Sequence, residues 1–232
     1  MTSATRVQKD TGTTIKPGPM LFASPEQVVT DADLADVAPG TGLNGPFLAD
    51  LLAAAAAHEN DGKNLFQALG HMTANPMLQA KFKQFREESV VAVQTYEQLA
   101  SRLGAPIRYI SPAARMTEAM DAKLLEAMQL SGSADPLVLE LKGVEAVLLA
   151  ATLCVANVAL LEHVAAGLPD GDAKAAFDEL LPALKDAGER HLEWAASTQR
   201  TMVTSQAGSA LVQSALGVAE NVVGKIKDVL RG

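Results

Sequence analysis

The chain has 232 residues, of which 48% are hydrophobic and 20% are charged. This composition excludes collagen-like, disulfide-scaffold and wholly disordered proteins, and the length suffices for one domain with a sizeable core. The net charge of −8 and the 4% of aromatic residues argue against a nucleic-acid partner. Phosphate binding needs a basic face, and base stacking needs aromatic platforms. The single cysteine, Cys154, cannot form a disulfide within the chain.

No feature of the sequence predicts a membrane or secretory segment. The first 19 residues lack the apolar stretch of a signal peptide. The longest apolar run, residues 146–161, is interrupted by Thr152 and Asn157. It is shorter than the roughly 20 residues that a membrane span needs. We therefore expect a cytoplasmic protein in which this run is a buried helix.

The first part of the chain, residues 1–43, is rich in Thr, Pro, Gly and Asp. This composition predicts an extended arm. One short helix is expected within it near Thr30–Val37, where Thr30 or Asp31 could act as the N-cap.

From residue 44 onwards the apolar residues recur three and four apart, which predicts long amphipathic helices. The pattern and the Pro and Gly breaks predict helices over about 46–72, 76–103, 135–166 and 172–204, with a connecting helix of about twenty residues after Ser111. Pro182 is expected to kink the last of these or to split off its first segment. The sequence thus predicts an all-α fold, with an antiparallel four-helix bundle over 44–204 and a helical crossover over 105–134.

The C-terminal part, residues 205–232, predicts a separate amphipathic helix. Its apolar face consists of Leu211, Ala215, Val218, Val222, Ile226 and Val229. The helix could fold back onto the bundle, pack against another subunit or lie on a membrane. We favour packing, because the segment has one net positive charge and no aromatic anchor. The arm and this helix predict a homo-oligomer, or a protein partner bound through either of them.

Polar residues on the predicted inner faces point to a site, because unpaired polar groups are costly there. They are His58 and Glu59, Glu88, Glu145 and His191. The stretches around them read His58-Glu59, Arg86-Glu87-Glu88, Glu145 and Glu189-Arg-His191-Leu-Glu193-Trp194. Over residues 46–204 this arrangement resembles the ferritin-like superfamily, which includes rubrerythrin and bacterioferritin. In the metal-binding members, two helices supply a lone glutamate and two supply Glu-x-x-His.

The resemblance implies that Glu59, Glu88, Glu145 and His191 hold a single iron or manganese ion, if any metal binds. Two ligands of the family pattern are missing, because Val91 and Gly188 stand at the positions of one histidine and one glutamate. A shifted register would bring in Glu87, Glu140, Glu189 or Glu193 instead. The alternative is a polar cluster without metal. His58 is a fifth ligand if a metal binds, or else an ordinary hydrogen-bonded core residue.

Three functions follow from these interpretations. The leading one is a ferritin-like bundle with a degenerate di-metal centre that acts as a binding, structural or assembly module. The second is a metal-dependent oxidoreductase or iron-handling protein, and the third is a carrier of an apolar small molecule. Met116, Met120 and Met128 lie on one face of the connecting helix, where a binding pocket could form beneath them. Cys154 is expected to be a small core residue and not a nucleophile.

Overall fold

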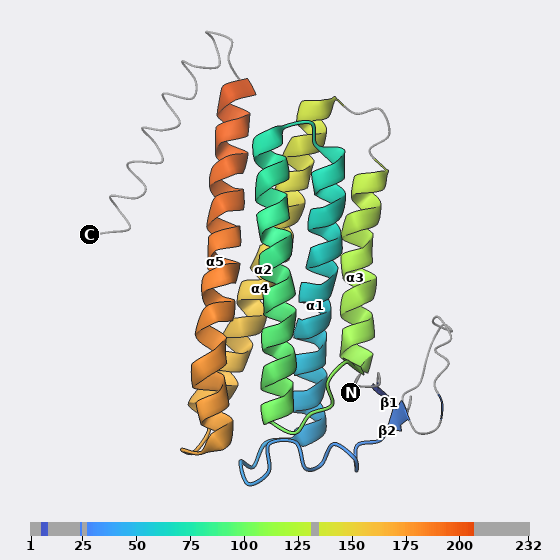
Figure 1. Cartoon of the computed structure of the whole chain (residues 1–232), viewed down its shortest axis with the longest axis vertical. Helices are drawn as coiled ribbons and strands as arrows, with labels where there is room; N and C mark the ends of the chain where they lie inside the picture. The colour runs from blue at the N-terminus through green and yellow to red at the C-terminus, as the bar shows by residue number, and fades with distance from the viewer. Residues whose placement is uncertain (1–5, 9–23, 25–26, 131–134, 207–232) are drawn as a thin grey trace, which may run out of the picture.

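The computed structural model describes residues 6–8, 24, 27–130 and 135–206. Its five helices run side by side along one long axis (Figure 1). They are α1 (Gly45–Met72), α2 (Pro76–Arg102), α3 (Pro112–Gln129), α4 (Pro136–Ala166) and α5 (Asp172–Gln206). The prediction of an all-α fold is therefore confirmed, with helix ends within about two residues of the expected positions.

Four of the helices begin with the same local chemistry. The side-chain oxygens of Asn44, Asn75, Ser111 and Asp135 each accept a hydrogen bond from a backbone N–H of the first turn. A proline stands in the first or second position of each of these helices. Proline is tolerated there because its missing N–H would have no partner within the helix.

The helices alternate in direction along the chain (Figure 1). α1 and α2 are antiparallel neighbours, as are α4 and α5. α2 also packs against α5, and α1 against α4. α3 lies on the outside against α1 and returns the chain to the end from which α4 starts.

Three short strands lie near the end of the bundle at which α1 begins, here called the strand end. β1 (Arg6–Gln8) lies between β2 (Val28–Val29) and β3 (Tyr109–Ile110), and both pairings are parallel. None of the three strands is predictable from the sequence, because two or three residues are too few to show an alternating pattern. β3 comes from the connection between α2 and α3, so these strands join the arm to the helices.

The described part of the arm packs against the bundle. Leu34 and Val37 are buried in the apolar cluster of the strand end. A Cβ on Gly45 would lie 2.3 Å from the carbonyl oxygen of Leu34, so only glycine permits this close approach. The short helix predicted near Thr30–Val37 is not found. Its place is taken by consecutive turns, in which the Asp33 carboxylate accepts hydrogen bonds from the backbone N–H and the hydroxyl of Thr30.

α5 continues through Pro182 to Gln206, so the predicted split of this helix is not found. Pro182 is exposed, and its ring therefore meets solvent rather than a packed neighbour. The predicted C-terminal helix, residues 205–232, lies almost entirely outside the described residues.

The core consists of two apolar clusters, one towards each end of the bundle. The cluster of the strand end includes Leu52, Tyr96, Leu99, Leu161 and Phe177. The cluster of the opposite end includes Phe66, Phe82, Phe85, Val144 and Val147. On α1, α2 and α5, buried polar residues such as His58, Ser89 and His191 lie between the two clusters.

α4 is the one described helix long and apolar enough to cross a membrane, with a mean hydropathy of 2.2 over its most apolar 18 residues. Residues of this stretch, including Val147, Ala151 and Cys154, are buried in the bundle. The core helix of a globular protein has the same composition, so this property is weak evidence for a membrane.

Candidate functional site

The candidate site is the layer of buried polar residues between the two apolar clusters, here called the mid-bundle polar layer. It consists of His58 and Glu59 on α1, Glu88 and Ser89 on α2, Cys154 on α4 and His191 on α5. Each residue lies three or four residues after an apolar residue on the inward face of its helix. The helix period of 3.6 residues therefore turns it inward as well. All of them are buried except Glu88, which is partly buried.

Glu88 and His191 join α2 to α5. The His191 Nε2 atom lies 2.8 Å from the Glu88 Oε2 atom, and Gln84 Nε2 donates to Glu88 Oε1 at 2.7 Å. The imidazole also packs on the ring of Phe85, with 4.0 Å between the ring centroids. These contacts fix both polar side chains against an apolar wall.

The protonation of this pair follows from its surroundings. Burial lowers the pKa of His191, and this effect outweighs the opposing hydrogen bond and charge of Glu88. Burial alone would raise the pKa of Glu88, but its hydrogen bonds with Gln84 and His191 and the charge of Arg190 lower it overall. Near neutral pH a neutral imidazole therefore donates its Nε2 proton to an ionised carboxylate.

Glu59 joins α1 to α2 and α4. It is buried and makes side-chain hydrogen bonds with Ser89 and Cys154. Burial raises the pKa of Glu59 more than these bonds lower it, so the protonated acid is favoured. Burial also raises the pKa of the Cys154 thiol well above its usual value. Cys154 is therefore not an activated nucleophile, in agreement with its predicted role as a core residue.

His58 joins α1 to α3 and α4. Its Nδ1 atom lies 2.7 Å from the Asp121 Oδ2 atom, and its Nε2 atom lies 3.0 Å from the carbonyl oxygen of Ala150. Both ring nitrogens thus face oxygen acceptors, which suits the doubly protonated ring. Burial lowers the pKa of His58, but the hydrogen bond and charge of Asp121 outweigh this effect and raise it overall.

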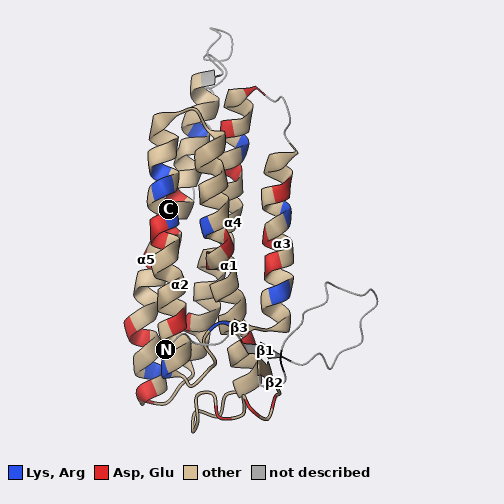
Figure 2. Cartoon of the chain, turned by 45° about the vertical axis from the view of Figure 1, so that its right-hand side comes forward, with Lys and Arg blue, Asp and Glu red and all other residues tan. Residues whose placement is uncertain are grey.

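Asp61 lies beside this pair, one turn further along α1. Its Oδ2 atom is the one buried side-chain oxygen in the described part of the chain that has no hydrogen-bond partner. Burial and the neighbouring charges of Asp121 and Glu118 raise the pKa of Asp61 to about 6. The interface between α1 and α3 therefore holds several carboxylates around one imidazolium; Figure 2 shows the charged residues along α3.

The four predicted metal ligands are not brought together. Glu88 and His191 form a pair, and Glu59 is bonded to Ser89 and Cys154. Glu145 is partly exposed and forms an ion pair with Lys142 at 2.6 Å. Over the described ranges, no three His, Cys, Asp or Glu residues are arranged to hold a metal ion. As placed, these residues do not fit a metal centre, and the predicted iron or manganese ion stays a prediction.

The alternative ligands also have other surroundings. Glu87, Glu189 and Glu193 are exposed. Glu140 is buried near the end of the bundle opposite the strand end, where its carboxylate accepts hydrogen bonds from the Thr73 hydroxyl and the Asn75 backbone N–H. Glu140 thereby fastens the turn between α1 and α2 to the first part of α4.

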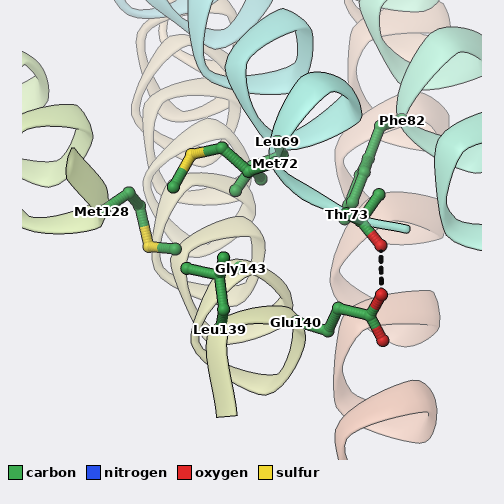
Figure 3. A pocket seen from close by; sticks show the side chains of 8 residues that line it. All are labelled: Leu69, Met72, Thr73, Phe82, Met128, Leu139, Glu140 and Gly143. Atoms are coloured by element: carbon green, nitrogen blue, oxygen red, sulfur yellow. Dashed lines mark hydrogen bonds between the residues drawn. The ribbon is translucent and has the colours of Figure 1, made fainter. Parts of the chain in front are cut away.

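A small cleft lies next to Glu140 (Figure 3). Its walls come from α1, α2, α3, α4 and the turn after α1 (Leu69, Met72, Thr73, Phe82, Met128, Leu139, Glu140 and Gly143). Of the three methionines on the connecting helix, only Met128 lines this cleft. Met116 and Met120 are exposed, so the predicted pocket beneath all three is not found among the described residues.

Two acidic residues beside His58 were not predicted from the sequence, Asp121 and Asp61. Ala114, Asp121 and Met128 recur every seven residues along the connecting helix and all turn inward. This repeat was the available signal for Asp121. Asp61 gave no such signal, since its position depends on how α3 sits over α1.

Comparison with protein-family models, curated proteins and solved structures gives no match to this chain. The ferritin-like resemblance therefore depends on the residues and helix order alone.

Proposed function

We propose that this protein is a ferritin-like helical-bundle protein that serves as a binding and assembly module, and that its mid-bundle polar layer joins the helices in place of a di-metal centre. The order of the helices supports the family. One antiparallel pair, a long crossover and a second antiparallel pair follow each other along the chain. Ferritin-like folds have their one long connection at the same place.

The observation that carries this proposal is the internal pairing of the polar layer. Glu88 bonds to His191, Glu59 to Ser89 and Cys154, and His58 to Asp121. Each pairing joins two or three different helices. Buried polar pairs of this kind can fix the register of packed helices, because any shift leaves a donor or acceptor without its partner. The layer is thus suited to holding a shape rather than to turning over a substrate.

The outer face of α3 supports the assembly part of the proposal. Met116 and Met120 are one turn apart and 68% and 64% exposed. Lys123 and Glu126 on the same helix form an ion pair with each other. This face therefore brings no excess of negative charge to a contact between two copies of a chain that carries −8 overall. We infer a homo-oligomer in the cytoplasm, with the exposed methionines of α3 in the contact.

Metal analysis tests the proposal against the alternative of an iron- or manganese-dependent enzyme. The full chain would be produced with both metals supplied, and its metal content measured by inductively coupled plasma mass spectrometry beside Glu88→Gln and Glu145→Gln. Glu88 belongs to the polar layer and Glu145 to the surface, so the second variant is the matched control. We expect no near-stoichiometric iron or manganese in any of the three proteins.

Near-stoichiometric metal in the parent chain that disappears in Glu88→Gln and persists in Glu145→Gln would contradict the proposal. It would show that the polar layer rearranges into a metal site and would favour the enzyme. Loss of the metal in both variants would contradict the proposal equally and would restore the full predicted ligand set.

A further inference from the structure

Among the residues that the structure describes, none covers the outer face of α4. α4 is apolar all round, and such helices are normally enclosed. Less than half of its most apolar 18-residue stretch is buried, however. Leu149 and Leu160 are 56% and 53% exposed, although both are large aliphatic side chains.

These exposed residues form one stripe. At 100° per residue, Val138, Leu149, Ala156 and Leu160 fall within a narrow arc of the helix surface, and all four are exposed. Lys142 and Glu145 lie in or beside the same arc and are paired with each other. The stripe, here called the α4 outer face, runs from Val138 to Leu160, which is 22 steps of 1.5 Å or about 33 Å.

We propose that the α4 outer face is covered by the C-terminal segment of the same chain, residues 207–232. The segment begins at a suitable place, because α5 ends at the same end of the bundle from which α4 starts (Figure 1). Gly208 and Ser209 follow after Ala207, and such residues allow a chain to reverse direction. After a short reversal the segment would run beside α4, antiparallel to α5.

The length and pattern of the segment match the face. Its apolar residues recur three and four apart from Leu211 to Val229, which as a helix would extend about 27 Å. An apolar stripe of this length can cover most of the distance between Val138 and Leu160. Burial of both stripes would provide the enclosure that α4 lacks.

The charges of the segment support the proposed direction, antiparallel to α5. The basic residues of the segment, Lys225, Lys227 and Arg231, stand in its last third. A helix that returns from Gln206 would bring them to the level of Glu162 on α4 and Asp186 on α5, near the pair that Lys185 forms with Glu162. Asp186, Glu189 and Glu193 are exposed along this part of α5. The carboxylates here outnumber Lys185 and Arg190, so the segment would bring positive charge to a part of the bundle with net negative charge.

Hydrogen exchange followed by mass spectrometry tests this assignment on the full chain. In the parent protein, we expect the amides of residues 211–229 to exchange at least ten times more slowly than an unstructured chain. In Leu149→Glu/Leu160→Glu, we expect this protection to be lost. The matched control is Met77→Glu/Val91→Glu, which places the same charges on exposed apolar positions of α2 and should leave the segment protected.

A second variant changes only the segment. Val218→Glu/Val222→Glu should also abolish the protection, while Gln213→Glu should not. Because glutamate has a higher intrinsic helix propensity than valine, such a loss reports lost docking and not a weaker helix. Circular dichroism of each variant checks that the bundle stays folded.

Three results would overturn the inference. The first is that the amides of residues 211–229 are unprotected in the parent. The second is that their protection survives in both Leu149→Glu/Leu160→Glu and Val218→Glu/Val222→Glu. Either result would show that the segment does not use the α4 outer face. The third is that the protection decreases when the protein is diluted, which would assign the α4 outer face to the C-terminal segment of a second copy. Self-association of the chain is measured separately, so the inference and the proposed function can fail independently.

Discussion

Three buried or half-buried acidic residues of this protein have different protonation behaviour because their partners differ. Glu59 has only neutral donors within reach, and burial raises its pKa. Glu88 accepts hydrogen bonds from Gln84 and His191, and its pKa is lowered overall. Asp61 has one oxygen without a partner and two acidic neighbours, which with burial raise its pKa to about 6. The residue type alone therefore says little about which of them is charged.

We predict that Asp61→Asn stabilises the protein at neutral pH. The pKa of Asp61 is about 6 in the folded chain against 3.8 for the ordinary group, so the folded state favours its protonated form. Its contribution to stability is present below pH 3.8 and is lost as the pH rises to 6. Asparagine resembles the protonated form at every pH. After a discount for partial exposure, we expect a gain of about 1 kcal/mol at pH 7.

Urea unfolding at pH 7 and at pH 4 measures this effect. The advantage of Asp61→Asn over the parent should shrink towards zero at the lower pH. The control is Asp170→Asn, at an exposed position of the turn between α4 and α5, which should change stability little at either pH. An equal gain at both values of pH would show that the effect does not come from ionisation of Asp61.

At the scale of the helices, most of the fold was predictable. Asn75, Ser111 and Asp135, each followed by proline, mark helix starts that the structure confirms. The turns over 31–36 were mistaken for a helix, because capping residues also stabilise isolated turns. Pro182 was expected to kink α5 or to split off its first segment, and only the split is not found, because α5 is continuous from Asp172 to Gln206. Proline removes one backbone hydrogen bond, and the burial of Leu181 and Leu184 beside it holds the helix together.

Close helix contacts depend on glycine at specific positions. A Cβ on Gly188 of α5 would lie 3.3 Å from Val155 and 3.5 Å from Cys154, both on α4. A Cβ on Gly70 of α1 would meet nothing within 4 Å. The two glycines thus look alike in sequence, but only Gly188 faces a packed helix.

We predict that Gly188→Val destabilises the protein by about 1–3 kcal/mol, because the added methyl groups push α5 away from α4. Gly70→Val is the matched control and should be neutral or slightly stabilising, because valine restricts the unfolded chain and has a better helix propensity than glycine. Thermal unfolding by circular dichroism compares the two variants with the parent. Equal destabilisation by both would mean that the contact between α4 and α5 tolerates a larger side chain.

At the scale of the whole molecule, the charge of −8 opposes contacts between copies, whereas the exposed methionines of α3 favour them. We predict that Met116→Glu/Met120→Glu raises the dissociation constant of self-association at least tenfold, a change of about 1.4 kcal/mol. Met77→Glu/Val91→Glu, which adds the same charge on α2, should have a much smaller effect. Sedimentation velocity over a range of concentrations measures both.

A monomeric parent chain at every concentration would contradict the proposed homo-oligomer. Equal weakening by both double variants would show that net charge, and not the α3 face, controls association. Added salt distinguishes these cases further, because screening restores association that charge alone had weakened.

The candidate site was predicted less completely than the fold. Helix periodicity indicated that four polar residues lie on or beside the inward faces of their helices. The structure places all four in the polar layer (His58, Glu59, Glu88 and His191). The periodicity could not indicate which of these residues contact one another, since that depends on how neighbouring helices are shifted along their axes. Glu145 was placed with them because it follows Val144 on the same helix. The structure turns Glu145 outward to Lys142 because the buried arc of α4 is narrow.

The described chain enters and leaves the bundle at opposite ends. β1 and β2 lie near the strand end, and α5 finishes at the other end, after 35 residues or about 52 Å of helix. A force applied between these two points pulls along the helix axes. The helices then have to slide past one another, and every contact of the polar layer has to break in the same step. A pull across the axes would instead separate the helices one contact at a time. The bundle is therefore expected to resist stretching most strongly along its length, and the rate of forced unfolding would reveal this directional strength.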